Sequence, residues 1–325
     1  MLTNAMLLVA LLAAAALLIW SVRRAWRSPR AVVRWPVSLL AGLFGLIFLV
    51  ISGAALRGMW MAYSHRGAPV TALVVERTPQ RLARGEHVAR VTCAGCHSTS
   101  GDVPLSGGKN LSDDTGMPLG VITPFNLTPA GPIRDWTDAE IFRAVRDAAD
   151  RDQRPLVVMS TQGVRNLSDE DVRSVVAFLR NQPPVERLTP PERLSFLSMV
   201  LAGAGMIPLD LSYRPERITA PRKAGTSAYG EYIVNWGGCR QCHGADLLGG
   251  KSIVVPNGPN LRVVKGWTRE QFIQTLRAGV DPYGKHLKPD LMPWKFIGRL
   301  DDDELSALYA YLSSLPTPAA GGTAR

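Results

Sequence analysis

The chain of 325 residues contains few cysteines and no acidic residue near its N-terminus. Four cysteines are too few for a fold that disulfides hold together. Residues 1–69 contain seven arginines and no aspartate or glutamate, and the rest of the chain has 30 basic and 27 acidic residues. The formal charge of +10 therefore falls to +3 outside this segment, too little for the basic stripe that nucleic-acid binding needs. No nucleic-acid partner is predicted.

Two long runs near the N-terminus, Leu2–Trp20 and Pro36–Leu56, contain only two polar residues each. As helices they would measure about 28 and 31 Å, close to the roughly 30 Å of a hydrocarbon core. Residues 21–34 between them carry five arginines, and the positive-inside rule places such a loop in the cytoplasm. A cleaved signal peptide is the alternative, but the first run lacks a basic start and a cleavage site before the arginines. We predict a hairpin in the cytoplasmic membrane, with both termini on the periplasmic side.

All four cysteines occur in two copies of one pattern, Cys93-Ala-Gly-Cys96-His97 and Cys239-Arg-Gln-Cys242-His243. In c-type haem attachment, two thiols add across the vinyl groups of haem and the adjacent histidine reaches the iron from the same side. The spacing therefore predicts two covalently attached haems, with His97 and His243 as axial ligands. Attachment outside the cytoplasm agrees with the predicted hairpin.

Other uses of a Cys-x-x-Cys pair fit less well. A thioredoxin-like redox pair would leave the histidine after each pair unexplained. A four-cysteine zinc site would need the pairs closer than the 143 residues that separate Cys96 from Cys239. A disulfide within so short a loop is strained and stabilises little.

The segments around the two motifs form an internal repeat, and each ends in a predicted helix, over residues 167–179 and 300–312. Two residue pairs have capping-box spacing at the start of these helices, Ser168 with Asp171 and Asp301 with Glu304. The other matched positions are Gly85-Glu86 with Gly230-Glu231, Asn126-Leu127 with Asn260-Leu261, Trp136-Thr137 with Trp267-Thr268, and Arg146 with Arg277.

On these residues both units resemble class I cytochrome c domains. The resemblance implies that a glycine on the first helix admits an aromatic residue from the last, and Gly85 with Phe178 and Gly230 with Tyr311 fit those places. The predicted fold is mainly α: an N-terminal two-helix transmembrane hairpin followed by two class I cytochrome c domains. The predicted boundaries are 1–68 for the hairpin, 78–186 for the first domain, 187–224 for a connector and 225–318 for the second domain.

The resemblance also implies a methionine thioether as the sixth iron ligand. Met292 lies in Leu-Met-Pro-Trp, eight residues before the leucine that opens the last helix, and Met159 lies eight residues before the equivalent leucine. Ser160 stands where the family usually has proline. Met117, His87 and His286 are the alternative ligands, and we predict Met159 and Met292.

The connector is rich in proline, and within it Leu194–Leu209 is a run of 16 uncharged residues. A helix of this length would measure about 24 Å, short for a membrane span. A third span would also leave the second haem motif in the cytoplasm, where haem is not attached. We interpret the run as an interdomain or interfacial segment.

These features predict electron transfer in a periplasmic respiratory chain, with no catalytic residue. Asn126-Leu-Thr-Pro-Ala and Leu-Ser-Asp-Glu-Asp resemble segments of the cytochrome subunits of membrane-bound alcohol and sugar dehydrogenases, which carry three haems. The hairpin followed by two haem domains also resembles the dihaem subunit of cbb-type oxidases. The predicted partners are the membrane and a dehydrogenase, an oxidase or a small electron carrier.

An enzyme with one open haem, of the peroxidase or thiosulfate-oxidising type, is the alternative function. It would need a vacant or cysteine-ligated iron, whereas haem attachment uses every cysteine and each unit offers a methionine. A gas or redox sensor would need a cytoplasmic signalling domain, which the sequence does not predict.

Overall fold

The computed structural model describes residues 2–64, 72–207, 209–214, 217–252 and 255–316. The chain forms two compact units, each built from several stretches of sequence. Unit 1 comprises Met1–His65, Asn110–Thr123 and Pro190–Leu211, and unit 2 comprises Arg66–Lys109, Pro124–Thr189 and Ser212–Arg325. The predicted domain ends at 68 and 318 lie outside the described residues.

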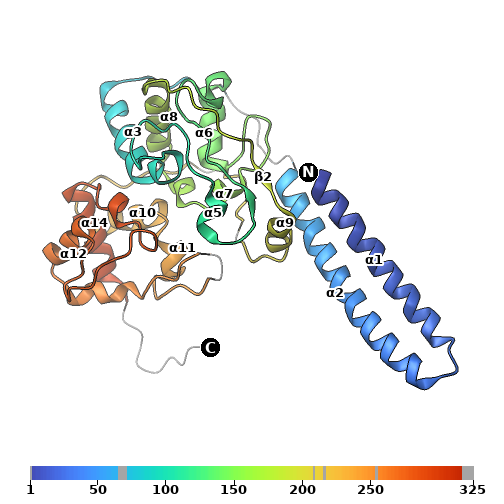
Figure 1. Ribbon diagram of the computed structural model, residues 1–325. Helices are drawn as coiled ribbons and strands as arrows, with labels where there is room; N and C mark the ends of the chain where they lie inside the picture. Colours follow the sequence, from blue (N-terminus) through green and yellow to red (C-terminus); the bar gives the residue numbers. More distant parts are fainter. Residues whose placement is uncertain (1, 65–71, 208, 215–216, 253–254, 317–325) are drawn as a thin grey trace. The chain divides into compact units, whose positions relative to one another are not determined.

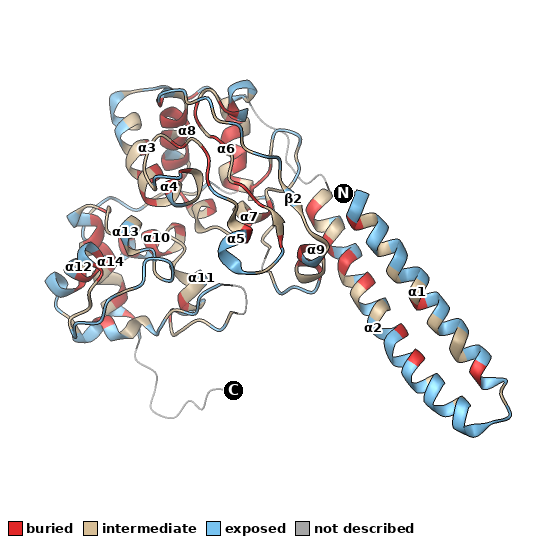
Figure 2. Ribbon diagram, in the orientation of Figure 1, coloured by how far each residue is buried: buried red, intermediate tan, exposed pale blue. Residues whose placement is uncertain are grey.

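Unit 1 is dominated by two long apolar helices that form an antiparallel hairpin, α1 (Leu2–Trp26) and α2 (Ala31–Tyr63) (Figure 1). Both are long and apolar enough to cross a membrane, and their large hydrophobic side chains are mostly exposed (Figure 2). The predicted loop of residues 21–34 is wrong in extent, because α1 continues through Arg23 and Arg24 and α2 begins before Arg34. Only residues 27–30 connect the helices. Arginine and alanine favour helix and let both helices run past their apolar stretches.

The remaining elements of unit 1 pack together near the C-terminal end of α2. They are α5 (Leu111–Thr115), β1 (Gly120–Val121), β2 (Arg193–Leu194) and α9 (Phe196–Gly203). The two short strands pair antiparallel, and Asn4 of α1 donates to the Leu194 carbonyl at 2.9 Å. With eight residues, α9 would measure about 12 Å, too short for a third span. Instead its backbone packs on α2 where glycine permits close approach: a Cβ on Gly58 would overlap the Met199 carbonyl.

Unit 2 contains both Cys-x-x-Cys-His segments and is built mainly from helices. The first repeat contains α3 (Pro79–Thr92), α4 (Ala94–His97), η1 (Pro132–Asp135), α6 (Asp138–Asp147), α7 (Val157–Ser160), η2 (Gly163–Asn166) and α8 (Asp169–Asn181). The second contains α10 (Ser227–Trp236), α11 (Cys239–His243), η3 (Leu261–Gly266), α12 (Arg269–Ala278), α13 (Trp294–Ile297) and α14 (Asp302–Ser314).

In each repeat the first helix packs tightly against the last. A Cβ on Gly85 of α3 would overlap the Ser174 carbonyl and approach Phe178 of α8. A Cβ on Gly230 of α10 would equally overlap α14 at Ala307 and approach Tyr311. These contacts confirm the predicted glycine–aromatic pairs, because only glycine lets the two backbones come this close.

The predicted helix starts differ in how completely they are capped. Asp301 and Glu304 form a full capping box at α14. At α8 the Ser168 side chain accepts from the Asp171 amide, but Asp171 does not return a bond. Its carboxylate instead binds Arg84 and Tyr232, so half of the predicted box is used for tertiary contacts.

One continuous hydrophobic core runs through both repeats of unit 2. It includes Val88 from α3 and Val176 from α8, and Ile233 from α10 and Leu308 from α14. Figure 2 shows buried residues on each of these helices, and in α8 the residues from Ser174 to Leu179 are all buried. The two repeats therefore form a single packed unit.

Candidate functional site

Each Cys-x-x-Cys-His segment begins where the first helix of its repeat ends. α3 ends at Thr92 and α4 carries the first motif to His97. In the second repeat, Gly238 in the left-handed region (φ +73°) turns the chain from α10 into α11. The four cysteines are half-buried, and burial raises the pKa of the Cys93 and Cys239 thiols to about 11. Once bonded to haem vinyl carbons, these sulfurs would be thioethers and would not titrate.

The two histidines are held in the same way by backbone carbonyls. His97 Nδ1 lies 2.9 Å from the Phe125 oxygen, and His243 Nδ1 lies 2.7 Å from the Pro259 oxygen. Because a carbonyl only accepts, Nδ1 must carry the proton in each ring, which leaves the Nε2 lone pair for a metal. Burial lowers the pKa of both histidines and favours this neutral form. This second bond is the one that orients iron-ligating histidines.

The second repeat also presents two buried donors that suit the carboxylates of a haem. Within the described residues, Arg262 Nε and Trp267 Nε1 are buried and have no hydrogen-bond partner. Both follow the His243 segment, on η3 and directly after it. Buried donors are normally satisfied, so an absent acceptor such as a haem propionate fits here. Gly258 lies against the His243 ring, where a Cβ would clash with Nδ1. These residues fit a haem held on His243.

The two predicted methionine ligands lie in differently built turns. Met292 is half-buried against the hydrophobic core, just before α13, and the next residue is proline. Met159 lies inside α7, where the Ser160 amide donates to the Leu156 oxygen at 2.9 Å. Proline has no such amide, which explains why the repeat that has serine forms a helical turn there. The Ser160 hydroxyl closes that turn on the Val157 oxygen at 2.7 Å.

The alternative ligands have other surroundings. Met117 belongs to unit 1, where its carbonyl accepts from Ser112 Oγ at 3.0 Å. His87 uses one ring nitrogen to contact Glu304 of the second repeat, Nε2 to Oε2 2.6 Å. His286 is exposed and pairs with Val280 through its backbone. The contacts of Met117 and His286 are made by their backbones, so the choice of axial ligands stays a prediction.

The sequence predictions missed the side chains that join the two repeats. Arg84 was not singled out, and His87 and Glu304 were considered only as a possible ligand and a helix cap. Arg84 donates from Nη1 to Glu304 Oε1 at 2.7 Å and from Nε to Asp171 Oδ1 at 2.7 Å. One feature in the sequence could have indicated this, a carboxylate at the third position of each last helix. The first helices give no matching charge, because tyrosines stand at the positions equivalent to Arg84 and His87.

Comparison with known proteins assigns both repeats to cytochrome c families. Residues 80–179 match the family described as "Cytochrome C oxidase, cbb3-type, subunit III", and residues 227–316 match the family described as "Cytochrome c". The chain therefore contains two cytochrome c domains, as predicted.

Similar proteins include cytochrome subunits of dehydrogenases. A subunit of the nicotinate dehydrogenase of Pseudomonas putida is 28% identical over 308 residues, which are 87% of this chain and 25% of that protein. The fructose dehydrogenase cytochrome subunit of Gluconobacter japonicus is 25% identical over 79% of this chain and 58% of its own length. A protein named "Diheme cytochrome c-type" from Cereibacter sphaeroides is 28% identical, covering 86% of this chain and 87% of its own. The chain thus spans a quarter of the first relative and over half of the second.

Proposed function

We propose that this chain, with its two cytochrome c domains, is a membrane-anchored dihaem cytochrome that carries electrons on the periplasmic side of the cytoplasmic membrane. The observation that carries the proposal is the matched pair of histidines. In both Cys-x-x-Cys-His segments a backbone carbonyl holds Nδ1 and leaves Nε2 for the iron. A single such site could be incidental, but two equivalent ones argue for two haems.

The proposed ligand set follows the repeat. Cys93 and Cys96 would attach the first haem and Cys239 and Cys242 the second. His97 with Met159, and His243 with Met292, would be the axial pairs. A thioether ligand raises the reduction potential and closes the iron to small molecules. A haem so held supplies reversible one-electron chemistry.

The residues of the chain would position each haem and exclude water. The carbonyls of Phe125 and Pro259 fix the orientation of the histidine rings. Arg262 and Trp267 would donate to the propionates of the second haem and compensate for burying them. No residue is needed as an acid or base, because an electron alone is transferred.

A dehydrogenase is the partner that the comparisons favour. Relatives over most of this chain are named as cytochrome subunits of fructose, gluconate and alcohol dehydrogenases. We infer that this chain accepts electrons from a dehydrogenase and passes them to the respiratory chain. The match of residues 80–179 to an oxidase subunit family makes an oxidase the second candidate.

Two measurements on the full chain, purified in mild detergent, test this proposal. The oxidised spectrum should show two low-spin haems with the near-infrared band of methionine ligation. After reduction, neither haem should bind carbon monoxide rapidly. A high-spin haem would instead support the enzyme with an open iron. Identification of the proteins that copurify then distinguishes the two candidate partners. A dehydrogenase is expected, and an oxidase would make the oxidase the first candidate.

A further inference from the structure

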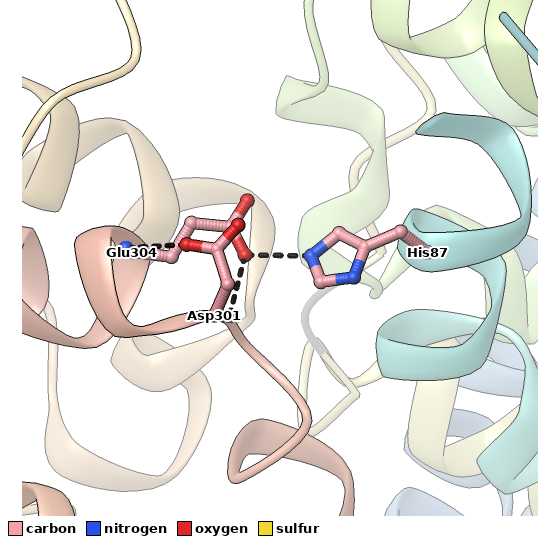
Figure 3. Close-up of side chains that lie close together, drawn as sticks. All are labelled: His87, Asp301 and Glu304. Atoms are coloured by element: carbon pink, nitrogen blue, oxygen red, sulfur yellow. Dashed lines mark hydrogen bonds and ion pairs between the residues drawn. The ribbon is translucent and has the colours of Figure 1, made fainter. Parts of the chain in front are cut away.

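A buried carboxylate of the second haem domain is surrounded by side chains of the first. Glu304, on α14, is fully buried. Its Oε1 accepts from Arg84 Nη1 at 2.7 Å. Its Oε2 lies 2.6 Å from His87 Nε2 (Figure 3). Both partners lie on α3. Burial alone would raise the pKa of Glu304, but the bonds from His87 and Arg84 outweigh it and hold this pKa at about 2. The carboxylate is therefore ionised and bound across the domain boundary.

The group of His87, Asp301 and Glu304 has the composition of a metal site, but its bonds indicate a different role. Glu304 Oε2 also accepts from the Asp301 amide at 3.1 Å in the helix cap. Lys223 forms an ion pair with Asp301 and lies 3.8 Å from Glu304 Oε1. Two protein cations and a histidine N–H thus already compensate these carboxylates, and an added cation would be repelled by Arg84 and Lys223.

The cross-domain contacts follow the internal repeat. His87 and Tyr232 each lie two residues after the glycine of the first helix, and Asp171 and Glu304 are each the third residue of the last helix. His87 reaches the carboxylate of the second domain, and the Tyr232 hydroxyl reaches Asp171 of the first. Arg84 binds both carboxylates. The junction is therefore reciprocal, with each first helix docked on the last helix of the other domain.

The same junction brings the haem-binding segment of each domain against the methionine loop of the other. The Gln241 side chain, between Cys239 and Cys242, donates to the carbonyl of Thr161, two residues after Met159. A Cβ on Gly95, between Cys93 and Cys96, would lie 3.5 Å from the ring of Phe296, four residues after Met292. Each candidate haem site thus touches the other domain.

Resting on the function proposed above, we propose that Glu304, with His87 and Arg84, is a positioning residue that fixes the two haems for direct electron transfer within the chain. The electron passes from the ferrous iron of one haem, which is oxidised, to the ferric iron of the other, which is reduced. No bond forms or breaks and no proton moves. Without these bonds, only apolar contacts would hold the two domains together, and the transfer would depend on how often the haems adopt a favourable separation.

The variant Glu304→Gln removes the charge and keeps the helix cap. The chain itself shows that glutamine serves there, because α12 has a complete capping box in which Gln271 is the third residue. The matched control is Glu140→Gln. Glu140 is the third residue of the capping box of α6, and the hydrogen bonds it makes stay within its own domain. Both variants remove one negative charge from a capping carboxylate, but only the Glu304 carboxylate contributes to the junction.

The measurement uses the full chain in detergent with both haems attached. A flash-generated reductant injects less than one electron per molecule, and freeze-quench EPR follows the two ferric signals. In wild type and Glu140→Gln, the injected electron should redistribute between the two haems in a first-order phase. The rate of this phase should not depend on protein concentration. Removing one partner of a buried pair lowers the ratio of molecules with the native junction to molecules with a broken junction by about a hundredfold. In Glu304→Gln, we therefore expect this phase to slow about tenfold or more and the iron–iron distance distribution in pulsed EPR to broaden.

Two further variants keep the proposal testable if Glu304→Gln folds poorly. His87→Asn removes the bond to Glu304, and Tyr232→Phe removes the bonds of its hydroxyl to Asp171 and the Ser168 amide. Both should slow the same phase by smaller factors. Unchanged transfer and an unchanged distance distribution in Glu304→Gln and His87→Asn would overturn the positioning role, although the carrier function would stand. A wild-type protein in which one haem is high-spin or is not reduced would instead overturn the proposed function.

Discussion

At the scale of single residues, the proposed function depends most on the axial methionines. We expect Met159→Ala and Met292→Ala to keep covalent haem, because attachment uses only the Cys-x-x-Cys-His residues. Each variant should open one iron, so that it binds one carbon monoxide per two haems, and should lower the potential of that haem because thioether ligation favours ferrous iron. Carbon monoxide titration and a redox titration would measure both effects.

Met117→Ala is the control for the first haem. Met117 lies in unit 1 with α5 and β1, and replacing it should change neither carbon monoxide binding nor potential. If Met117→Ala opened the first haem and Met159→Ala did not, the assignment of Met159 would be wrong, and the electron-transfer function would survive.

A second residue-scale prediction concerns a turn that both cytochrome c domains share. The amides of Gln153 and Gly284 donate to Asp150 and Asp281 at 3.0 Å, and both residues have positive φ, 64° and 83°. A left-handed conformation costs a residue other than glycine about 1–2 kcal/mol, partly offset by the entropy that glycine loses on folding. Gln153→Gly should therefore stabilise the protein by roughly 0.5 kcal/mol, or about 1–2 °C in thermal unfolding.

The reverse substitution, Gly284→Gln, tests the cost of the same left-handed conformation in the second domain. It should lower the midpoint of thermal unfolding by a similar or larger amount, measured by circular dichroism of the full chain. A lower midpoint for Gln153→Gly would show that this glutamine side chain contributes more than its backbone strain costs.

At the scale of helices and loops, the sequence predicts the repeated part of the fold and not the inserted part. The helix periodicity, the caps and the pairs at Gly85 and Gly230 are local or repeated signals, and the structure has them. Asn126 follows His97 by 29 residues, whereas Asn260 follows His243 by 17, so the first domain carries an insertion. The sequence shows its length but not its partner, because a two-residue strand such as β1 has no periodicity.

The junction between the domains escaped prediction for a related reason. Arg84, His87 and Glu304 are ordinary charged residues of amphipathic helices, and their neighbours are up to 220 positions away along the chain. The histidine motifs were predictable because haem attachment fixes their spacing. Methionine ligation rests on a single residue in each repeat, so Met159 and Met292 stay predictions.

The contact of α9 with α2 gives a prediction at this scale. Gly58 and Gly53 both lie on α2, but a Cβ on Gly58 would overlap the Met199 backbone whereas a Cβ on Gly53 meets open space. Gly58→Ala should displace α9 at a cost of roughly 1–3 kcal/mol. Gly53→Ala should be neutral or stabilising by up to about 1 kcal/mol, because alanine favours helix.

Limited proteolysis in detergent would measure this difference. Trypsin should cleave after Arg193, in β2 just before α9, about tenfold faster in Gly58→Ala than in wild type. Gly53→Ala should match wild type. Equal cleavage in both variants would show that α9 does not depend on its packing against α2.

At the scale of the whole molecule, the anchor and the haem units must lie in the right compartments. The N-terminus of α1 and the C-terminus of α2 meet at one end of the hairpin, where Asn4 binds the Leu194 carbonyl. The other end has the short turn, where Arg34 lies over Trp26 at 5.3 Å from the ring centroid. Aromatic rings favour the headgroup layer and arginines favour the cytoplasmic side. Along the sequence, the haem domains come after the C-terminal end of α2. This end of the hairpin has no arginine cluster and is the periplasmic end in the proposed orientation.

Reporter fusions test this orientation directly. Alkaline phosphatase fused after Ala68 should be active and after Arg30 inactive, because the enzyme is active only outside the cytoplasm. A β-galactosidase fusion at the same two positions is the control and should give the opposite pattern. Replacing the arginines at 23, 24, 27 and 30 with glutamine should raise phosphatase activity of the Arg30 fusion, since each basic residue in the turn contributes to holding it inside. An active phosphatase after Arg30 in the wild-type sequence, with an inactive one after Ala68, would place both Cys-x-x-Cys-His segments in the cytoplasm, where haem is not attached to them, and the dihaem function would then be excluded.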